Sequence, residues 1–276
     1  MCLIKKVSSS RKWILPILIL LSFYIAGCGT LNNGRGWGQD AIYPVDLKRV
    51  GRAAHNAFFD LQTLVPAIGA LIFTIDDWDE KASDWAIDHN PVFGSIEDAV
   101  DASDAINTFL MAETVITTLA TPSGDDPKTW AYSKFKGACV EIAANKAATR
   151  TTSYLKKKVG RKRPDESNDK SFPSGHATKA FSLSTLSNRN LDSIHMNKYL
   201  KRSLQTTNIL LATGTAWARV EGHRHYPSDV LAGSALSHFL IAFIHDAFMG
   251  LPEDNKFDFV ILPRKKGAEF KFTIQF

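Results

Sequence analysis

Cysteine is scarce in this chain of 276 residues, which contains only Cys2, Cys28 and Cys139. Two of the three lie within the first thirty residues, so a single thiol remains for the rest of the chain and cannot form an internal disulfide. We predict that Cys139 is a buried, inert thiol on a helix. Long apolar runs are missing as well. No stretch of 18 uninterrupted apolar residues occurs, and the sequence therefore predicts no transmembrane helix.

An excess of positive charge is also missing once the N-terminus is set aside. The whole chain has 33 Lys and Arg against 28 Asp and Glu, a formal charge of +5. Residues 1–27 hold four of these cations and no acid, which leaves 29 cations against 28 acids and a charge of +1. A nearly neutral protein lacks the basic surface that nucleic acid needs. We therefore predict no nucleic-acid partner.

Clustered metal ligands are absent from the sequence pattern too. The acidic stretch Asp76–His89 has several carboxylates but no grouped histidines beside them. Such a stretch is more often a solvated helix face than a metal site. We predict a solvated face here, and neither a metal nor another cofactor for the protein.

The N-terminus has the layout of a secretory signal peptide. A basic start precedes an apolar run of about a dozen residues, Trp13–Tyr24, which is shorter than the ~20 that span a membrane. Ile25-Ala26-Gly27-Cys28 resembles the lipobox of bacterial lipoproteins, which implies cleavage after residue 27 and acylation of Cys28 by palmitate-type chains. The alternative is an ordinary signal peptide with an incidental cysteine. Gly29 rather than Asp follows Cys28, and this favours the outer membrane facing the periplasm.

The remaining chain is predicted to be one helical domain over 43–276. Residues 28–42 are expected to be the lipidated cysteine and a flexible tether, because Thr30–Asp40 is rich in Gly and Asn. Apolar residues at spacings of three and four predict the helices. These cover Asp46–Phe59, Asp60–Ile75, Asp76–His89, Ser95–Leu119, Lys128–Val159, Ala177–Leu186, Ser203–Val220 and Ser228–Met249. Alternating apolar residues in 256–276 predict a β-hairpin that packs on the helical body.

Three clusters between Lys156 and Asp229 carry the chemistry. Lys156, Arg163 and Arg219 offer three cations that can surround the oxygens of a phosphate, the arginines through bidentate contacts. The turn Pro173-Ser174-Gly175-His176 offers a hydroxyl, and a glycine that lets the backbone approach an anion, with a helix N-terminus behind it. His176 beside this turn is a candidate acid.

The third cluster offers a nucleophile. His225 and Asp229 are four residues apart across a turn that opens a helix. Asp229 can accept a hydrogen bond from the Nδ1–H of His225, which fixes the tautomer and leaves Nε2 free to attack phosphorus. His223 competes for this role, and the spacing of the residues alone does not separate the two histidines.

Together these clusters resemble the signature of a known family. Lys156-x6-Arg163-Pro164, Pro173-Ser-Gly-His176 and Arg219-x5-His225-x3-Asp229 are similar to the three motifs of the type 2 phosphatidic acid phosphatase (PAP2) superfamily. That family includes lipid phosphate phosphatases, bacterial non-specific acid phosphatases and vanadium haloperoxidases. Two departures occur: Ala218 stands where the third motif usually has Ser, and only eight residues separate Pro164 from Pro173.

The resemblance implies an all-α bundle with its active site at helix ends. It further implies that His225, oriented by Asp229, forms a phosphohistidine, and that His176 protonates the leaving group and then activates water. The phosphate would be held by Lys156, Arg163, Ser174, Gly175 and Arg219. The expected activity is metal-independent hydrolysis of phosphate monoesters, with a lipid phosphate or pyrophosphate as the favoured substrate and a soluble phosphomonoester as the alternative. The alternatives are a vanadate-dependent haloperoxidase, which shares the motifs, and a catalytically silent scaffold lipoprotein of the cell envelope.

Overall fold

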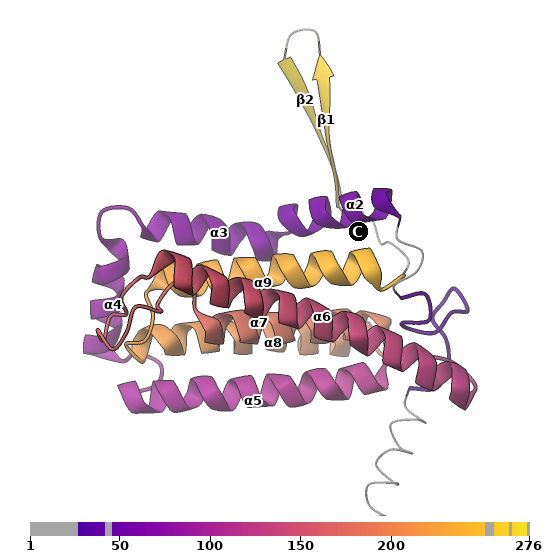
Figure 1. The fold of residues 1–276 in the computed structure, drawn as a ribbon, viewed down its shortest axis with the longest axis horizontal. Coiled ribbons are helices and arrows are strands. Elements are labelled where there is room, and N and C mark those ends of the chain that lie inside the picture. The colour runs from indigo at the N-terminus through magenta and orange to yellow at the C-terminus, as the bar shows by residue number, and fades with distance from the viewer. Residues whose placement is uncertain (1–26, 42–45, 252–256, 265–266, 275–276) are drawn as a thin grey trace, which may run out of the picture.

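The computed structural model describes residues 27–41, 46–251, 257–264 and 267–274 of the chain. Within these ranges the body is built of eight α-helices (Figure 1), which confirms the predicted all-α bundle. The helices are α2 (Leu47–Phe59), α3 (Leu61–Phe73), α4 (Trp78–His89), α5 (Ile96–Ala120), α6 (Pro127–Val159), α7 (Gly175–Ser193), α8 (Lys198–Glu221) and α9 (Pro227–Phe248).

Most helices begin where a short polar side chain can cap them. The side chain of Asp46, Asp60, Ser95 or Asp126 accepts a backbone N–H from the first turn of the helix that follows it. Such caps satisfy donors that have no partner inside the helix. They explain why the predicted boundaries of α2, α3, α5 and α6 lie within two residues of those observed.

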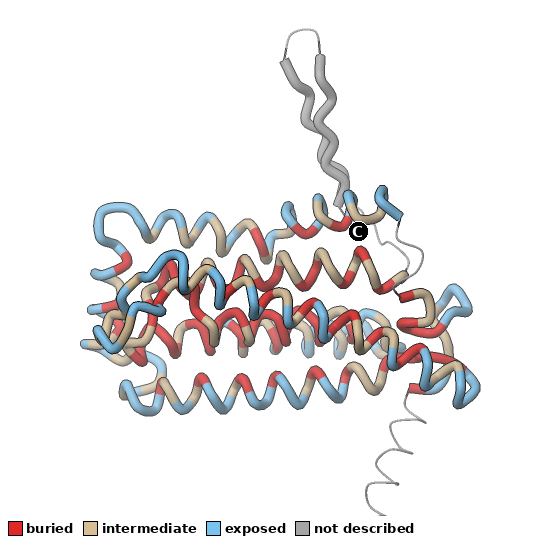
Figure 2. The backbone as a smooth tube through the Cα atoms, viewed as in Figure 1, coloured by how far each residue is buried: buried red, intermediate tan, exposed pale blue. Residues whose placement is uncertain are grey.

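The α7 helix is the centre of the bundle and runs seven residues beyond its predicted end at Leu186. It is buried along most of its length (Figure 2) and packs against α5, α6, α8 and α9. The buried face of α7 contains many polar side chains, so the apolar spacing that predicts a helix is incomplete there. Several of these side chains form hydrogen bonds with neighbouring helices inside the core. Thr178 lies 3.0 Å from Thr152 of α6, and Ser187 lies 2.9 Å from Thr114 of α5. Small paired hydroxyls let helices pack closely without leaving polar atoms unsatisfied.

The segment expected to be a flexible tether is docked on the bundle, and that prediction was wrong. Trp37 is fully buried, and its ring lies where a Cβ on Gly137 would stand. The backbone N–H of Trp37 donates to Pro122 O at 2.7 Å, and the Lys134 ammonium lies 5.2 Å from the indole centroid. Composition missed this contact because the anchoring tryptophan lies among glycines and asparagines.

The cysteines and the N-terminus are only partly described. Cys28 is exposed, and Cys139 is half-buried rather than buried as predicted. The predicted signal peptide, including Ile25 and Ala26 of the lipobox, lies outside the described residues apart from Gly27.

Two parts of the described chain are long and apolar enough to cross a membrane. One is α9, of which 56% of the apolar window is buried inside the bundle. The other is the pair α2 and α3 taken together, which is bent by 49°. Length and composition alone make these candidates, and a buried core helix passes the same test. The absence of a transmembrane helix stays a prediction.

Two strands, β1 (Phe257–Arg264) and β2 (Gly267–Ile274), pair antiparallel near the C-terminus, with Phe257 opposite Ile274. Their side chains lie outside the described residues. The expected packing of a C-terminal hairpin on the helical body therefore stays a prediction.

Candidate active site at one end of the bundle

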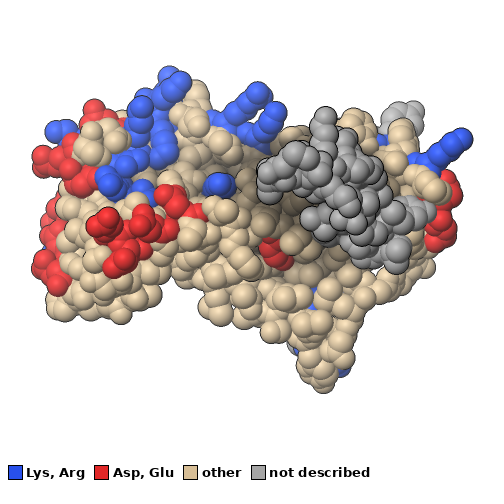
Figure 3. All heavy atoms as spheres, turned by 90° about the horizontal axis from the view of Figure 1, so that it is seen from below, with Lys and Arg blue, Asp and Glu red and all other residues tan. Residues whose placement is uncertain are grey.

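The three predicted clusters meet at one end of the bundle, where α6 and α8 end and α7 and α9 begin (Figure 1). Backbone bonds fix this meeting. The N–H of Ser174 donates to Asp229 O at 2.9 Å, and the N–H of His225 donates to Arg219 O at 3.1 Å. Lys and Arg side chains gather toward the same end of the molecule, with acidic side chains beside them (Figure 3). The arrangement suits an anion held between helix ends.

The turn before α7 is pressed against the first turns of α9. Ser174 is fully buried, and its hydroxyl accepts the N–H of Ala177 as the N-cap of α7. A Cβ on Gly233 of α9 would lie 2.7 Å from Ser174 O, closer than real Cβ atoms approach. The absence of a side chain at Gly233 thus permits the contact. Gly175 is next to Lys156, whose Cε would lie 3.7 Å from a Cβ at that position.

Three cations surround the space beside this turn. Burial, together with the charge of Arg163, lowers the pKa of Lys156 to about 8. Arg219 is 4% exposed, and burial lowers its pKa to about 10. Arg219 donates through Nη1 to Ser103 Oγ at 3.1 Å, while its Nε and the Nε of Arg163 are buried without a partner. Buried donors without acceptors are costly, and an anion in the site would satisfy them.

His225 is 1% exposed and is held as the neutral imidazole. Burial lowers its pKa to about 4, although Asp229 acts in the opposite direction. Asp229 is fully buried as well. Burial favours its neutral acid, but His225 and the charge of Arg161 together hold the pKa of Asp229 below its usual range. The pair therefore consists of a neutral imidazole and a carboxylate.

The expected hydrogen bond between these two residues is not formed in the structure. The Nδ1 of His225 lies 3.7 Å from Asp229 Oδ2, and this nitrogen has no hydrogen-bond partner. Asp229 Oδ2 instead accepts the N–H of Tyr226 at 2.9 Å and the hydroxyl of Ser171. Catalytic hydrogen bonds are often long before substrate binds. A shift of under 1 Å would bring Nδ1 within bonding distance of the carboxylate.

His176 lies at the open side of the site and has a carboxylate partner that the motifs do not contain. Its Nε2 is 2.8 Å from Asp104 Oδ1 of α5, and the Asp104 side chain is 64% exposed. Burial and the charge of Arg219 lower the pKa of His176, and Asp104 opposes both effects. The competing histidine His223 lies half-buried just after α8, with a positive φ of 56°.

Several residues that hold this site were missed by the motif analysis. Asp79 of α4 and Arg161 contact Ser228 and Asp229 at the start of α9, while Ser103 and Asp104 of α5 contact Arg219 and His176. Asp79 lies in the acidic stretch that was predicted to be solvated. Its 4% exposure corrects that prediction at one residue, because the carboxylate caps another helix. No local sequence signal distinguishes Asp79 from its exposed neighbours.

The other histidines lie away from this cluster. His238 is buried and bonds through Nδ1 to Thr185 Oγ1 at 2.9 Å, and His245 lies 3.1 Å from Asp246. In the described part of the chain, no group of three or more His, Cys, Asp or Glu could hold a metal ion.

Comparison with known proteins supports the resemblance. None of the curated proteins matches the chain. A solved structure does: the transmembrane PAP2 type phosphatidylglycerolphosphate phosphatase from Bacillus subtilis, with a TM-score of 0.52 and 21% sequence identity. The similarity covers 70% of this chain and 94% of that one, and it establishes a shared fold. Residues 137–251, which contain every residue of the three motifs, match the family model of the PAP2 superfamily.

Proposed function

We propose that this protein is a phosphatase that hydrolyses phosphate monoesters without a metal, through a phosphohistidine on His225. The observation that supports it most directly is the buried, neutral His225 beside cationic side chains whose buried N–H groups lack acceptors. A neutral imidazole has a lone pair with which to attack, and the unsatisfied donors match the oxygens of a phosphoryl group. Residues 137–251, which match the PAP2 family model, contain these groups.

In the first step, Nε2 of His225 attacks phosphorus while the bond from phosphorus to the leaving oxygen breaks. Asp229 accepts a hydrogen bond from the Nδ1–H of His225, which keeps its proton, and so stabilises the positive charge that develops on the ring. His176 gives a proton to the leaving oxygen, which departs as an alcohol. Lys156, Arg163 and Arg219, with the backbone at Ser174 and Gly175, hold the three phosphoryl oxygens as charge redistributes.

In the second step, a water molecule attacks the phosphohistidine. His176, now neutral, takes a proton from that water, the bond from nitrogen to phosphorus breaks, and phosphate leaves. His225 returns to its neutral form and His176 to its protonated form. Because Nε2 of His176 faces Asp104, the other ring nitrogen is the one available for proton transfer.

A lipid phosphate is the substrate class we favour, because an anchor on Cys28 would keep the protein at a membrane. Cys28 is exposed and stands at the start of the docked segment, next to Gly27, whose O accepts the Nε1–H of Trp130 near the start of α6. The site lies near the other end of α6, roughly 40 Å away along its axis. An anchored molecule would therefore have to lie along the membrane for its site to reach a lipid phosphate. We infer an outer-membrane lipoprotein facing the periplasm.

Phosphate release from a panel of esters tests the proposed function. The panel comprises lysophosphatidate, phosphatidylglycerophosphate, undecaprenyl pyrophosphate and a soluble monoester, each measured with EDTA and with vanadate. Release should survive EDTA and be blocked by vanadate. His225→Ala should lose at least about 10³-fold in kcat, whereas His223→Ala should stay within tenfold of wild type. Full activity in His225→Ala would overturn the proposed nucleophile.

A separate experiment tests the anchor. Cells that express the protein are labelled with a radioactive fatty acid, and the wild type is compared with Cys28→Ser. We expect the label and the membrane association to be lost in the variant, because a thiol is needed for acylation. Retention of both in Cys28→Ser would contradict the anchor and leave the phosphatase proposal standing.

A further inference from the structure

Asp79 makes a complete set of contacts to the first turn of α9, although it belongs to α4. Its Oδ1 accepts the N–H of Ser228 at 2.7 Å. Its Oδ2 accepts the hydroxyl of Ser228 and the Nη2 of Arg161, the latter at 2.9 Å. A buried carboxylate is stable only when paired and hydrogen-bonded in this way. Asp79 therefore acts as an N-terminal cap for α9 supplied from a distant part of the chain.

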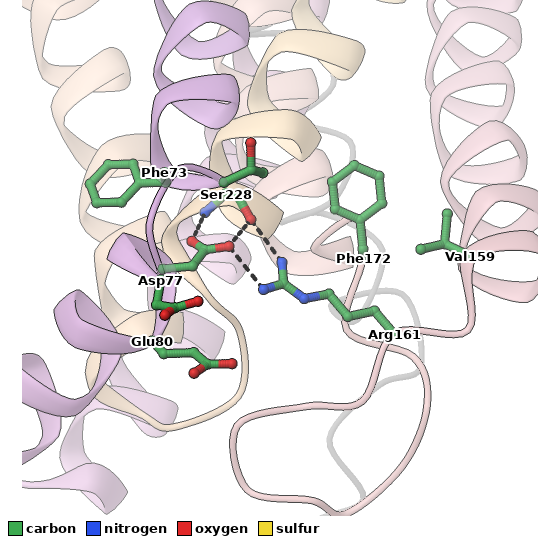
Figure 4. A pocket seen from close by; sticks show the side chains of 9 residues that line it. Phe73, Asp77, Glu80, Val159, Arg161, Phe172 and Ser228 are labelled. Atoms are coloured by element: carbon green, nitrogen blue, oxygen red, sulfur yellow. Dashed lines mark hydrogen bonds and ion pairs between the residues drawn. The ribbon is translucent and has the colours of Figure 1, made fainter.

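Arg161 joins this carboxylate to Asp229. Its Nη1 donates to Asp229 Oδ1 at 3.0 Å and to Ser228 Oγ at 2.8 Å, while Nη2 faces Asp79. The guanidinium also lies 4.0 Å from the ring centroid of Tyr226. Figure 4 shows Arg161 and Ser228 joined by a dashed line, and both residues line a cavity of about 300 Å³. Only a planar guanidinium can bind two carboxylates and stack on an aromatic ring at once.

These contacts determine where the Asp229 carboxylate stands. One oxygen is held by Arg161, and the other by Ser171 and the N–H of Tyr226. Asp79 competes with Asp229 for the same guanidinium. Because it shares the cation, Asp79 limits how strongly Arg161 attracts Asp229, and so leaves more of the Asp229 charge to act on His225.

We propose that Asp79 is a positioning residue of the reaction, which acts through Arg161 and Ser228 to place Asp229 and to set its hold on His225. The proposal rests on the proposed function. It adds a residue of α4 to those that the reaction needs, and α4 lies outside the region 137–251 that matches the family model. Asp79 contacts neither His225 nor the phosphate-binding side chains directly in the structure, so it is not itself a catalytic residue.

The decisive variant is Asp79→Asn, which keeps the size of the side chain and removes its charge. We expect kcat for phosphate release to fall about 10- to 100-fold, as for other residues that orient catalytic groups. The KM should change by less than about threefold, because Asp79 does not touch the phosphate. Asp77→Asn and Glu80→Gln are matched controls, since both acids are exposed and line the same cavity. Their kcat should stay within twofold of wild type.

A purely structural cap would also lower activity, so a second readout is needed. Titration of the His225 imidazole by NMR should show its midpoint falling by about half a unit in Asp79→Asn, because a nearby negative charge has been removed. The two control variants should leave the midpoint unchanged. A lost cap alone would reduce the melting temperature and leave the midpoint of the folded protein where it is in the wild type.

Two further variants cover the remaining outcomes. If Asp79→Asn does not fold, Ser228→Ala tests the same link, because it removes the hydroxyl between Asp79 and Arg161 and keeps the backbone bond. We expect a 3- to 10-fold loss of kcat. In the double variant with Arg161→Lys, the effect of Asp79→Asn should nearly vanish, since the residue acts through the arginine. Wild-type kcat and an unshifted His225 midpoint in Asp79→Asn would overturn this inference alone. An inactive wild type would overturn the proposed function.

Discussion

The activity of this protein should be confined to the acid side of neutrality. His225 must be neutral to attack, and its pKa is about 4, so kcat/KM should fall as the pH drops through that value. His176 must be protonated to act as an acid, and its pKa is held below the ordinary 6.5. The rate should therefore also fall as the pH rises through a value under 6.5. The resulting pH profile is bell-shaped. Removal of Asp104 should shift its alkaline side and leave its acid side unchanged.

The size of that shift follows from the exposure of the ion pair. Asp104 lies 2.8 Å from Nε2 of His176, but its side chain is 64% exposed. Solvent screens such pairs, which are worth about 0.2–1 kcal/mol. One pKa unit corresponds to about 1.4 kcal/mol. In Asp104→Asn the protonated His176 loses this support, so the alkaline limb should move down by roughly 0.1–0.7 pH unit, while the acid limb stays near pH 4.

The measurement is kcat/KM for one phosphate monoester between pH 3 and pH 8 at constant ionic strength. The ester itself titrates near pH 6, but it is the same in every arm, so differences between variants belong to the protein. Asp101→Asn is the control, because Asp101 is an exposed acid on the same helix, three residues away. If Asp104→Asn and Asp101→Asn have the same alkaline limb as wild type, either His176 is not the acid or its contact with Asp104 does not matter.

Two other substitutions test the packing that supports the site and the docked N-terminal segment. Gly233→Ala places a methyl group 2.7 Å from Ser174 O, so it should destabilise the fold by about 1–3 kcal/mol and reduce phosphate release. The control is Gly214→Ala, whose Cβ would meet nothing closer than 3.8 Å and which should stabilise the fold by about 0.5–1 kcal/mol. Chemical denaturation measures both, and equal stability in the two variants would contradict the close contact. Trp37→Ala removes a fully buried ring and should cost about 3–5 kcal/mol, opening residues 27–41 to proteases while kcat is retained in the protein that remains folded. Leu47→Ala, at a residue 82% exposed, should change neither stability nor cleavage, and protection of the segment in Trp37→Ala would show that it is held elsewhere.

The helices could be predicted because their signals are local. Apolar spacing and capping residues such as Ser95 and Asp126 lie within one or two turns of the boundary that they set. The meeting of the three motifs could be predicted from the resemblance alone. The structure brings the cations, the 174–175 turn, His176, His225 and Asp229 to one end of the bundle, whereas their roles in the reaction remain proposals.

The errors arose where a tertiary contact outweighed the local pattern. Trp37 follows a glycine-rich stretch, yet a groove beside Gly137 buries its ring. Asp79 resembles the exposed acids around it until α9 supplies an N–H and a hydroxyl, and Arg161, which follows α6, supplies a guanidinium. In both cases the partners lie more than 80 residues away along the chain. Composition averaged over a short window contains no information about such a partner.

The supporting residues share an electrostatic property that the motifs do not reveal. Arg161 and Asp79 add one cation and one anion, and Asp104 adds an anion that faces His176, which is cationic when it acts as an acid. Each addition is therefore neutral as a pair. The net charge that faces the substrate therefore still comes from the cations Lys156, Arg163 and Arg219 and the anion Asp229. Groups added in neutral pairs can hold His176 and Asp229 in place without adding net positive charge to the site. Added positive charge would bind phosphate more tightly and slow the release of the product. Because neither carboxylate is among the groups that hold the phosphate, substitutions at Asp79 and Asp104 should act mainly on kcat and on the pH profile.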